Sequence, residues 1–454
     1  MQNSLLRQLL RIALPLMAGN LVQTLYNLTD TFFLGKLGAA ELSAPTIAFP
    51  IIFFLILFGI GLSMAGTTLI AQAKGQTQEI SQEKGAQEKL DFYLGQSTLT
   101  LMITSLILSA AGLLMAEPLL KLLQTPEEVS DFTRDYMHII FAGLPFMFGF
   151  LVLQSGMQGI GRTMVPLIVQ VFTVALNIGL DPLLIFGIGP FPAMGVKGAA
   201  IATVFARGIG STIAFVVLIQ GRYGIQLRLK NLRPQPDSIR LLLRIGLPSS
   251  FGQAASALGF TVLQGIVNSF GAAVIAAFGV GNRLINLFNM PAMGISRATT
   301  TVVGQNLGAG NPERAREAVV LSIILIQSFL LPAMVLTFFY GSSFVRFFID
   351  DPETMRYGAQ LFRVVAPSVI LFGFFHAVTG ALQGAGDTRS IMFLNIARLW
   401  VLRVPVAYLL GFVIGIGPGA IWWAMFVSNM ATAVAGLLYL RKGSWVRALD
   451  PEEV

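Results

Sequence analysis

Long apolar stretches separated by short charged segments constrain the fold of this chain more than any other feature of its sequence. Hydrophobic residues make up 55% of the 454 residues, charged residues only 11%, and the mean hydropathy is +0.74. A helix needs about 20 mostly apolar residues to cross the hydrocarbon core of a bilayer. The pattern is therefore typical of an all-α integral membrane protein.

Twelve stretches are long and apolar enough to be crossings. They are residues 9–34, 44–73, 92–116, 136–157, 164–187, 197–220, 245–269, 273–305, 317–340, 357–381, 390–415 and 419–440. The first is too long for the apolar part of a signal peptide, so we expect it to stay as a helix. The chain has no cysteine and only two histidines, which excludes disulfides and thiolate metal sites and argues against a histidine metal cage.

The basic residues are distributed unevenly between the two sides of these twelve crossings. Eighteen lysines and arginines fall on the side that holds the N-terminus and six on the other side. Because basic residues favour the cytoplasmic side, we expect both termini in the cytoplasm and the chain in the plasma (inner) membrane. This topology accounts for the net charge of +8, and nucleic-acid binding is not expected.

An internal repeat relates the two halves of the chain. RIALP at 11–15 recurs as RIGLP at 244–248, and an offset of 233 residues gives 18 identities over 65 ungapped positions. Each half holds six crossings, so the repeats share one orientation and predict two pseudo-symmetric six-helix bundles around a central cavity. We predict an N-terminal bundle at 1–220, a cytoplasmic linker at 221–243, and a C-terminal bundle with a short tail at 244–454. One interpretation is that gene duplication produced a stable helical bundle without a transport role. We favour the other, in which two bundles move about a central cleft, because this plan is common in alternating-access transporters.

Two aspartates in the first half break the symmetry of the repeat. Asp30 aligns with Leu263, and Asp181 lies inside another predicted crossing, whereas the acids between 244 and 440 fall in predicted loops or at helix ends. An aspartate at the centre of a membrane helix costs about 2.5–3.5 kcal/mol, and tolerated acids usually mark ion or proton paths. The alternative is a polar residue near the interface that is hydrogen-bonded to its neighbours.

The two aspartates are expected at similar depth, because their crossings run in the same direction and both acids lie in the final third. Residues four apart share a helix face, so Tyr26 accompanies Asp30 and Asn177 accompanies Asp181. Thr203, on the following crossing, lies near the same level. These five residues predict an oxygen-lined site for H⁺ or for Na⁺, the latter held by Asp30, Asn177, Asp181 and Thr203. If the two acids meet, burial and mutual repulsion favour protonation of at least one.

Other positions carry weaker expectations. Arg283, Gln154 and Met157 are candidates for the substrate cavity, although a structural role is favoured for Arg283. The remaining arginines within or at the edge of the predicted spans are expected to reach the interface or to neutralise a neighbour. They are Arg207, Arg297, Arg363, Arg398 and Arg403.

The sequence resembles the multidrug and toxic compound extrusion (MATE) transporters over nearly its whole length. The resemblance rests on ALPLMAGNLVQTLYNLTDTFFLGKLG (13–38), LNIGLDP (176–182) and the paired QGIGRT (158–163) and QGAGDT (383–388). It implies two six-helix bundles around a cavity and export of small organic compounds, often cationic, driven by an H⁺ or Na⁺ gradient. Within the family the chain looks like the DinF-like branch, in which the positions of Tyr26, Asp30, Asn177, Asp181 and Thr203 couple the ion. We expect a monomeric antiporter, not an enzyme, with no cofactor beyond the coupling ion.

Three other functions stay open at this point. A lipid-linked precursor flippase of the same superfamily would use interior arginines such as Arg283. An intramembrane aspartyl protease would need two facing aspartates, but no GxGD-like segment surrounds Asp30 or Asp181. A passive channel would conduct without dependence on a counter-ion.

Overall fold

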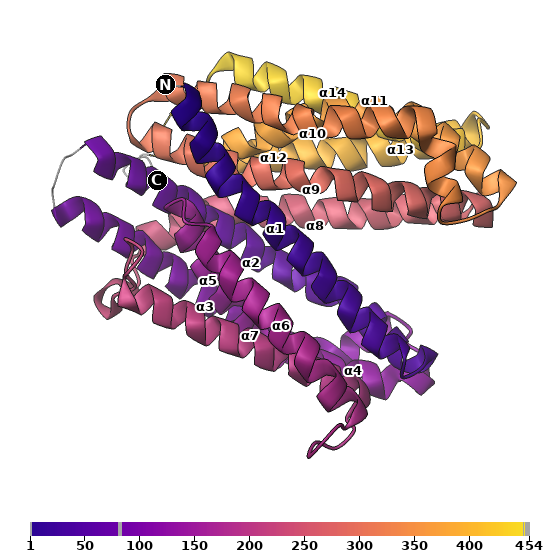
Figure 1. Ribbon diagram of the computed structural model, residues 1–454, viewed down its shortest axis with the longest axis horizontal. Coiled ribbons are helices and arrows are strands. Elements are labelled where there is room, and N and C mark those ends of the chain that lie inside the picture. The colour runs from indigo at the N-terminus through magenta and orange to yellow at the C-terminus, as the bar shows by residue number, and fades with distance from the viewer. Residues whose placement is uncertain (1, 80–83, 448, 450–454) are drawn as a thin grey trace. The chain divides into compact units, whose positions relative to one another are not determined.

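The computed structural model describes residues 2–79, 84–447 and 449, and these residues form helices and no strand (Figure 1). The end of the predicted tail, residues 450–454, lies outside the described residues. In chain order the elements are α1 (Gln2–Gly35), α2 (Ala39–Glu79), α3 (Lys84–Leu122), α4 (Glu127–Ala142), α5 (Leu144–Gly159), α6 (Met164–Phe186), α7 (Gly195–Gln220), η1 (Leu229–Leu232), α8 (Pro236–Asn268), α9 (Ala272–Gly308), α10 (Pro312–Arg346), α11 (Pro352–Ala385), α12 (Thr388–Ile396), η2 (Ala397–Arg403), α13 (Val404–Tyr408), η3 (Leu409–Val413) and α14 (Gly419–Lys442). Helices satisfy their backbone polar groups internally, as a bilayer requires. The predicted all-α class is confirmed.

The helices correspond to the predicted crossings. Ten described helices are long and apolar enough to span a membrane, counting α12 to η3 as one, and the bent pair α4 and α5 would make an eleventh. Helix α8 is 33 residues long, but serines, glutamines and glycines lower its hydropathy. Helix α8 corresponds to the seventh predicted stretch, 245–269. When it is counted together with the helices above, each of the twelve predicted stretches has a matching helix or helix pair.

Two crossings differ from the uniform helices that the hydropathy predicts. The stretch at 136–157 is built from α4 and α5, which are bent by 44° at Gly143. Pro145 stands at the start of α5, where its missing N–H does not interrupt the helix ladder. The stretch at 390–415 contains two π-helical segments, η2 and η3. Apolar content does not encode such local changes of winding.

The chain forms two compact units. We call residues 18–250 the first unit, and residues 2–17 together with 251–449 the second unit. The boundaries after Met17 and after Ser250 fall inside α1 and α8 and are separated by the repeat offset of 233 residues. They do not coincide with the predicted limits at 220 and 244, so the division into bundles 1–220 and 244–454 with a linker at 221–243 stays a prediction.

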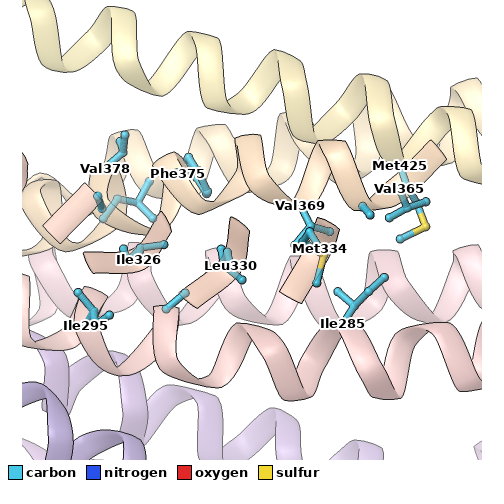
Figure 2. Packing of buried hydrophobic residues seen from close by; sticks show 14 of the residues in the cluster. Ile285, Ile295, Ile326, Leu330, Met334, Val365, Val369, Phe375, Val378 and Met425 are labelled. Carbon is cyan, nitrogen blue, oxygen red and sulfur yellow. The ribbon is translucent and has the colours of Figure 1, made fainter. Parts of the chain in front are cut away.

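An apolar core holds the second unit together. Helix α11 packs against α9, α10 and α14, and Figure 2 shows their side chains meeting. The labelled residues are Ile285 and Ile295 from α9, Ile326, Leu330 and Met334 from α10, Val365, Val369, Phe375 and Val378 from α11, and Met425 from α14. Lipid chains are as apolar as these side chains, so close van der Waals packing, rather than removal from water, holds the helices together in a bilayer.

Acidic residues of the second unit serve as helix caps. The Asp351 carboxylate accepts hydrogen bonds from the backbone N–H (2.8 Å) and hydroxyl (2.6 Å) of Thr354 at the start of α11. These hydrogen bonds hold the pKa of Asp351 below its usual value. Asp387 caps α12 and accepts a hydrogen bond of 2.7 Å from the Tyr439 hydroxyl. Both acids therefore lie at helix ends, as the sequence predicted.

In the first unit, two side chains of α3 form hydrogen bonds with the segment 221–243, which the sequence predicts to be a linker. Buried Asp91 accepts a hydrogen bond from the Gln226 N–H (2.8 Å) and forms an ion pair with Arg228 (3.1 Å). Gln96 donates to the carbonyls of Asn231 and Arg233, both at 2.8 Å, and accepts from the Gln235 N–H at 3.0 Å. A side chain at Gly95 would collide with the Asn231 carbonyl, 2.4 Å from its Cβ. The segment is thus packed on α3.

We expect Asp91→Ala to lower the melting temperature of the purified protein in a nonionic detergent. The substitution leaves the Gln226 N–H without its acceptor and removes the charge that pairs with Arg228, and loss of the acceptor costs about 1–3 kcal/mol. Lys230→Ala is the matched control, because it removes only the exposed ion pair of Lys230 (58% exposed) with Glu88 (59%), worth about 0–1 kcal/mol. Equal shifts in the two variants would contradict the role given to Asp91.

Candidate functional site

The five residues predicted to bind the coupling ion lie on three helices of the first unit. Tyr26 and Asp30 are on α1, Asn177 and Asp181 on α6, and Thr203 on α7. Asn177 and Asp181 have no exposed surface, Thr203 and Tyr26 are 6% and 8% exposed, and Asp30 is half-buried.

Direct contacts join these five side chains. The hydroxyls of Tyr26 and Thr203 share a hydrogen bond of 2.9 Å, and Asn177 Nδ2 donates to Asp181 Oδ1 at 3.2 Å. The Asp30 carboxyl lies close enough to Asp181 and Tyr26 to interact electrostatically with both side chains. The structure therefore brings the predicted residues together, while their part in ion binding stays a prediction. We call them the acidic cluster.

The acidic cluster contains more acceptors than donors. Three of its buried oxygens have no hydrogen-bond partner among the described residues, and they are Asp30 Oδ1, Asp181 Oδ2 and Asn177 Oδ1. A buried polar atom without a partner costs about 1–3 kcal/mol. A proton shared by the carboxyls would satisfy some of these oxygens, and so would a hard cation, which prefers carboxylate, carbonyl and hydroxyl oxygens. The residues present fit both H⁺ and Na⁺.

Close packing of α6 against α7 positions the cluster. A side chain at Gly198 on α7 would lie 2.4 Å from the Leu184 carbonyl on α6, so only glycine permits this approach. Pro182 follows Asp181 within α6 and has no N–H to donate to the carbonyl of Ile178, which is freed one turn before Asp181. The sequence therefore places Asp181 where α6 and α7 approach closely.

Sequence reasoning gave no specific role to a polar network beside the cluster. Arg207, one turn after Thr203 on α7, donates to Gln23 Oε1 at 3.2 Å and lies 5.1 Å from the centre of the Tyr26 ring. It also acts electrostatically on Asp30. Gln170 on α6 donates to the Gly19 carbonyl at 3.1 Å and to Gln23 at 3.4 Å. The sequence did contain a signal for Arg207, because it follows Thr203 by four residues and residues four apart share a helix face.

A second tyrosine also lies near the acidic cluster. Tyr136 on α4 interacts electrostatically with both Asp30 and Asp181 and packs against the apolar cluster that contains Leu34 and Ile185. The sequence offered no signal for this residue, because a single sequence does not encode which side chains meet across helices.

The candidates for the substrate cavity are placed as follows. On α5, Met157 has no exposed surface and Gln154 is half-buried. Arg283 is exposed on α9 and belongs to the second unit. Their joint role stays a prediction.

The Tyr26–Thr203 hydrogen bond should be measurable in a double-mutant cycle. Tyr26→Phe and Thr203→Val are each expected to lower the melting temperature. Because either substitution removes the same hydrogen bond, the double variant should be no less stable than the less stable of the two single variants. The coupling should be on the order of 1 kcal/mol.

Thr46→Val provides the control for this cycle, because the Thr46 hydroxyl bonds only the Leu42 carbonyl of its own helix. Its effect should add to that of Tyr26→Phe. Additive effects of Tyr26→Phe and Thr203→Val would show that the two hydroxyls do not interact.

Comparisons with known proteins give one consistent family. A family model described as MatE matches residues 15–183 and 248–409. The chain is 29% identical to "Probable multidrug resistance protein YpnP" of Bacillus subtilis, which covers 98% of this chain and 96% of the relative. It is 27% identical to an "FAD transporter" of Shewanella oneidensis, with 94% and 93% covered. "Crystal structure of MATE in the bent conformation" has the same fold, with a TM-score of 0.88, 24% identity, and coverage of 98% and 97%.

Proposed function

Because the chain belongs to the MatE family, we propose that it is a secondary active antiporter that exports organic compounds, cationic or amphiphilic, in exchange for H⁺ or Na⁺. Proteins of this family are membrane transporters, so the chain is a multi-pass membrane protein and not an enzyme. The observation that carries the coupling proposal is the proximity of Asp30 and Asp181 in a cluster with buried oxygens that have no hydrogen-bond partner among the described residues. Assignment to the DinF-like branch stays a prediction.

The names of the relatives support transport of organic molecules. One relative is named for multidrug resistance and another for FAD, so the family takes more than one kind of substrate. These names favour neither the flippase nor the aspartyl protease.

In the proposed cycle, the acidic cluster exchanges its ion as the cavity opens to one side and then to the other. Asp30 and Asp181 supply the charge that binds H⁺ or Na⁺. Asn177 donates to Asp181, which leaves its carbonyl oxygen available to the ion. Arg207 lies beside Tyr26, where its positive charge stabilises the ion-free acids and favours release.

Topology and location are part of the proposal. The excess of eighteen basic residues over six on the side that holds the N-terminus supports cytoplasmic termini in the plasma (inner) membrane. We propose that one chain is the functional unit, because both predicted bundles are present in it.

We expect Asp30→Asn to abolish gradient-driven uptake of a cationic dye into everted membrane vesicles, because it removes one of the two charges that bind the ion. Asp181→Asn should have the same effect, because it removes the other charge. Dye fluorescence after the gradient is imposed is the measurement, with the amount of protein in the membrane measured in parallel.

Asp131→Asn is the matched control for both variants, because its side chain is 79% exposed and pairs only with Arg134 one turn away. It should transport like the wild type. Full activity of Asp30→Asn at normal membrane levels would defeat the coupling mechanism.

Proteoliposomes with separately imposed gradients identify the ion. We expect either the pH gradient or the Na⁺ gradient to drive dye uptake, and the effective gradient should lose its effect in Asp30→Asn. Dye flux at equal rates without any gradient would indicate a passive channel and would exclude antiport.

A further inference from the structure

Two arginines are buried in the second unit without an acidic partner. Arg398 is 7% exposed and Arg403 is 2% exposed, and both lie in the π-helix η2. None of the ion pairs found among the described residues includes either one. A buried charge that lacks a counter-charge is strongly destabilising, and ionisable residues inside membrane proteins usually serve function. An anion from outside the chain would resolve this imbalance.

Neutral groups hold Arg403 in a defined position. Its Nε donates to the Ser428 hydroxyl at 2.9 Å and its Nη2 donates to Asn429 Oδ1. Asn429 is itself fixed, because it donates to the Ser368 hydroxyl at 3.2 Å. Its guanidinium lies 5.5 Å from the centre of the Phe260 ring. These contacts orient the charge but do not neutralise it.

Arg398 is bound less completely than Arg403. Its only hydrogen bond found among the described residues goes to Asn395 Oδ1 at 3.4 Å, and its buried Nε has no partner there. The guanidinium lies 4.5 Å from the centre of the Phe372 ring. His376, whose buried Nε2 also has no partner among the described residues, packs edge-on against the same ring with centroids 5.1 Å apart. The Arg398 Nε donor and a ring nitrogen of His376 thus lie on the same aromatic ring and have no partner among the described residues.

The π-helical winding of η2 brings the two arginines toward one side. In an α-helix, residues five apart point about 140° from each other, since one turn takes 3.6 residues. A π-helix closes hydrogen bonds between residues five apart, which is the separation of Arg398 and Arg403. The two charges act on each other electrostatically, so a shared anion would remove their repulsion as well.

We propose that Arg398 and Arg403 bind the oxyanion of a transported amphiphile, a carboxylate or a phosphate. Guanidinium groups match the geometry of both anions and bind them through two parallel hydrogen bonds. Phe260 and Phe372 cover the guanidinium faces, and such limited access to water strengthens the ionic interaction. The inference rests on the proposed function, since it assigns a substrate class to the same transporter. It predicts that acidic amphiphiles are substrates alongside cationic ones.

Intrinsic fluorescence gives a direct test of anion binding. All four tryptophans (Trp400, Trp422, Trp423 and Trp445) belong to the second unit, and Trp400 lies in η2 between the two arginines. Purified full-length protein in nonionic detergent is titrated with dodecyl phosphate, dodecanoate, dodecyltrimethylammonium and inorganic phosphate. We expect saturable changes with the first two compounds and at least tenfold weaker affinity for them in Arg398→Gln. Arg363→Gln, which removes an exposed arginine of α11, is the matched control and should bind like the wild type.

Several outcomes would overturn the proposal. Equal affinity of Arg398→Gln and the wild type for dodecyl phosphate would show that the arginine does not bind it. Equal affinity for inorganic phosphate and dodecyl phosphate would show a simple anion site rather than a substrate site. If Arg398→Gln does not fold, Arg398→Lys keeps the charge but not the two parallel donors and should weaken binding several-fold. If neither variant folds, the wild type decides, because the absence of saturable binding of both dodecyl phosphate and dodecanoate would exclude an anion site. The titration needs no gradient, so a failure of ion-coupled export would leave its result unchanged.

Discussion

A charge placed among membrane-spanning helices must meet an opposite charge, an ion or a substrate, and this constraint decides where the chain can place ionisable residues. In the first unit, Asp30 and Asp181 lie together near Arg207, and three buried oxygens of their cluster lack hydrogen-bond partners among the described residues. In the second unit, Asp351 and Asp387 lie at helix ends, where they cap α11 and α12. The buried charges thus concentrate where an ion or a substrate can compensate them.

The two halves share a helical framework and differ in the charges that they bury. RIALP in α1 recurs as RIGLP in α8, but Asp30 aligns with Leu263. Leu263 has no exposed surface and belongs to the apolar core of the second unit. The first unit buries acids, whereas the second buries Arg398 and Arg403 among neutral groups. A duplicated scaffold can therefore assign ion binding to one half and substrate recognition to the other without changing how its helices pack.

Much of this arrangement could be predicted from the sequence, because long apolar stretches and four-residue spacing have direct physical consequences. Hydropathy located the crossings, and the spacing of Tyr26 with Asp30 and of Asn177 with Asp181 identified residues that do lie in contact. The bend at Gly143 and the π-helix η2 were not predicted, because they change backbone winding and leave the apolar pattern intact. The contacts of Arg207 with Gln23, and of Asp91 with the segment after α7, depend on which side chains meet across helices, and a single sequence does not encode these pairings.

The account depends on Asp30 and Asp181 acting as one site that takes up an ion. Difference infrared spectroscopy of the purified protein observes the carboxyl groups directly, because protonated and ionised carboxyls absorb at different frequencies. A change of pH or addition of Na⁺ should produce a carboxyl difference band in the wild type, and both Asp30→Asn and Asp181→Asn should remove or shift the whole band, since the acids are coupled. A band that persists unchanged in either variant would contradict the account, because that aspartate would then take no part in binding the ion.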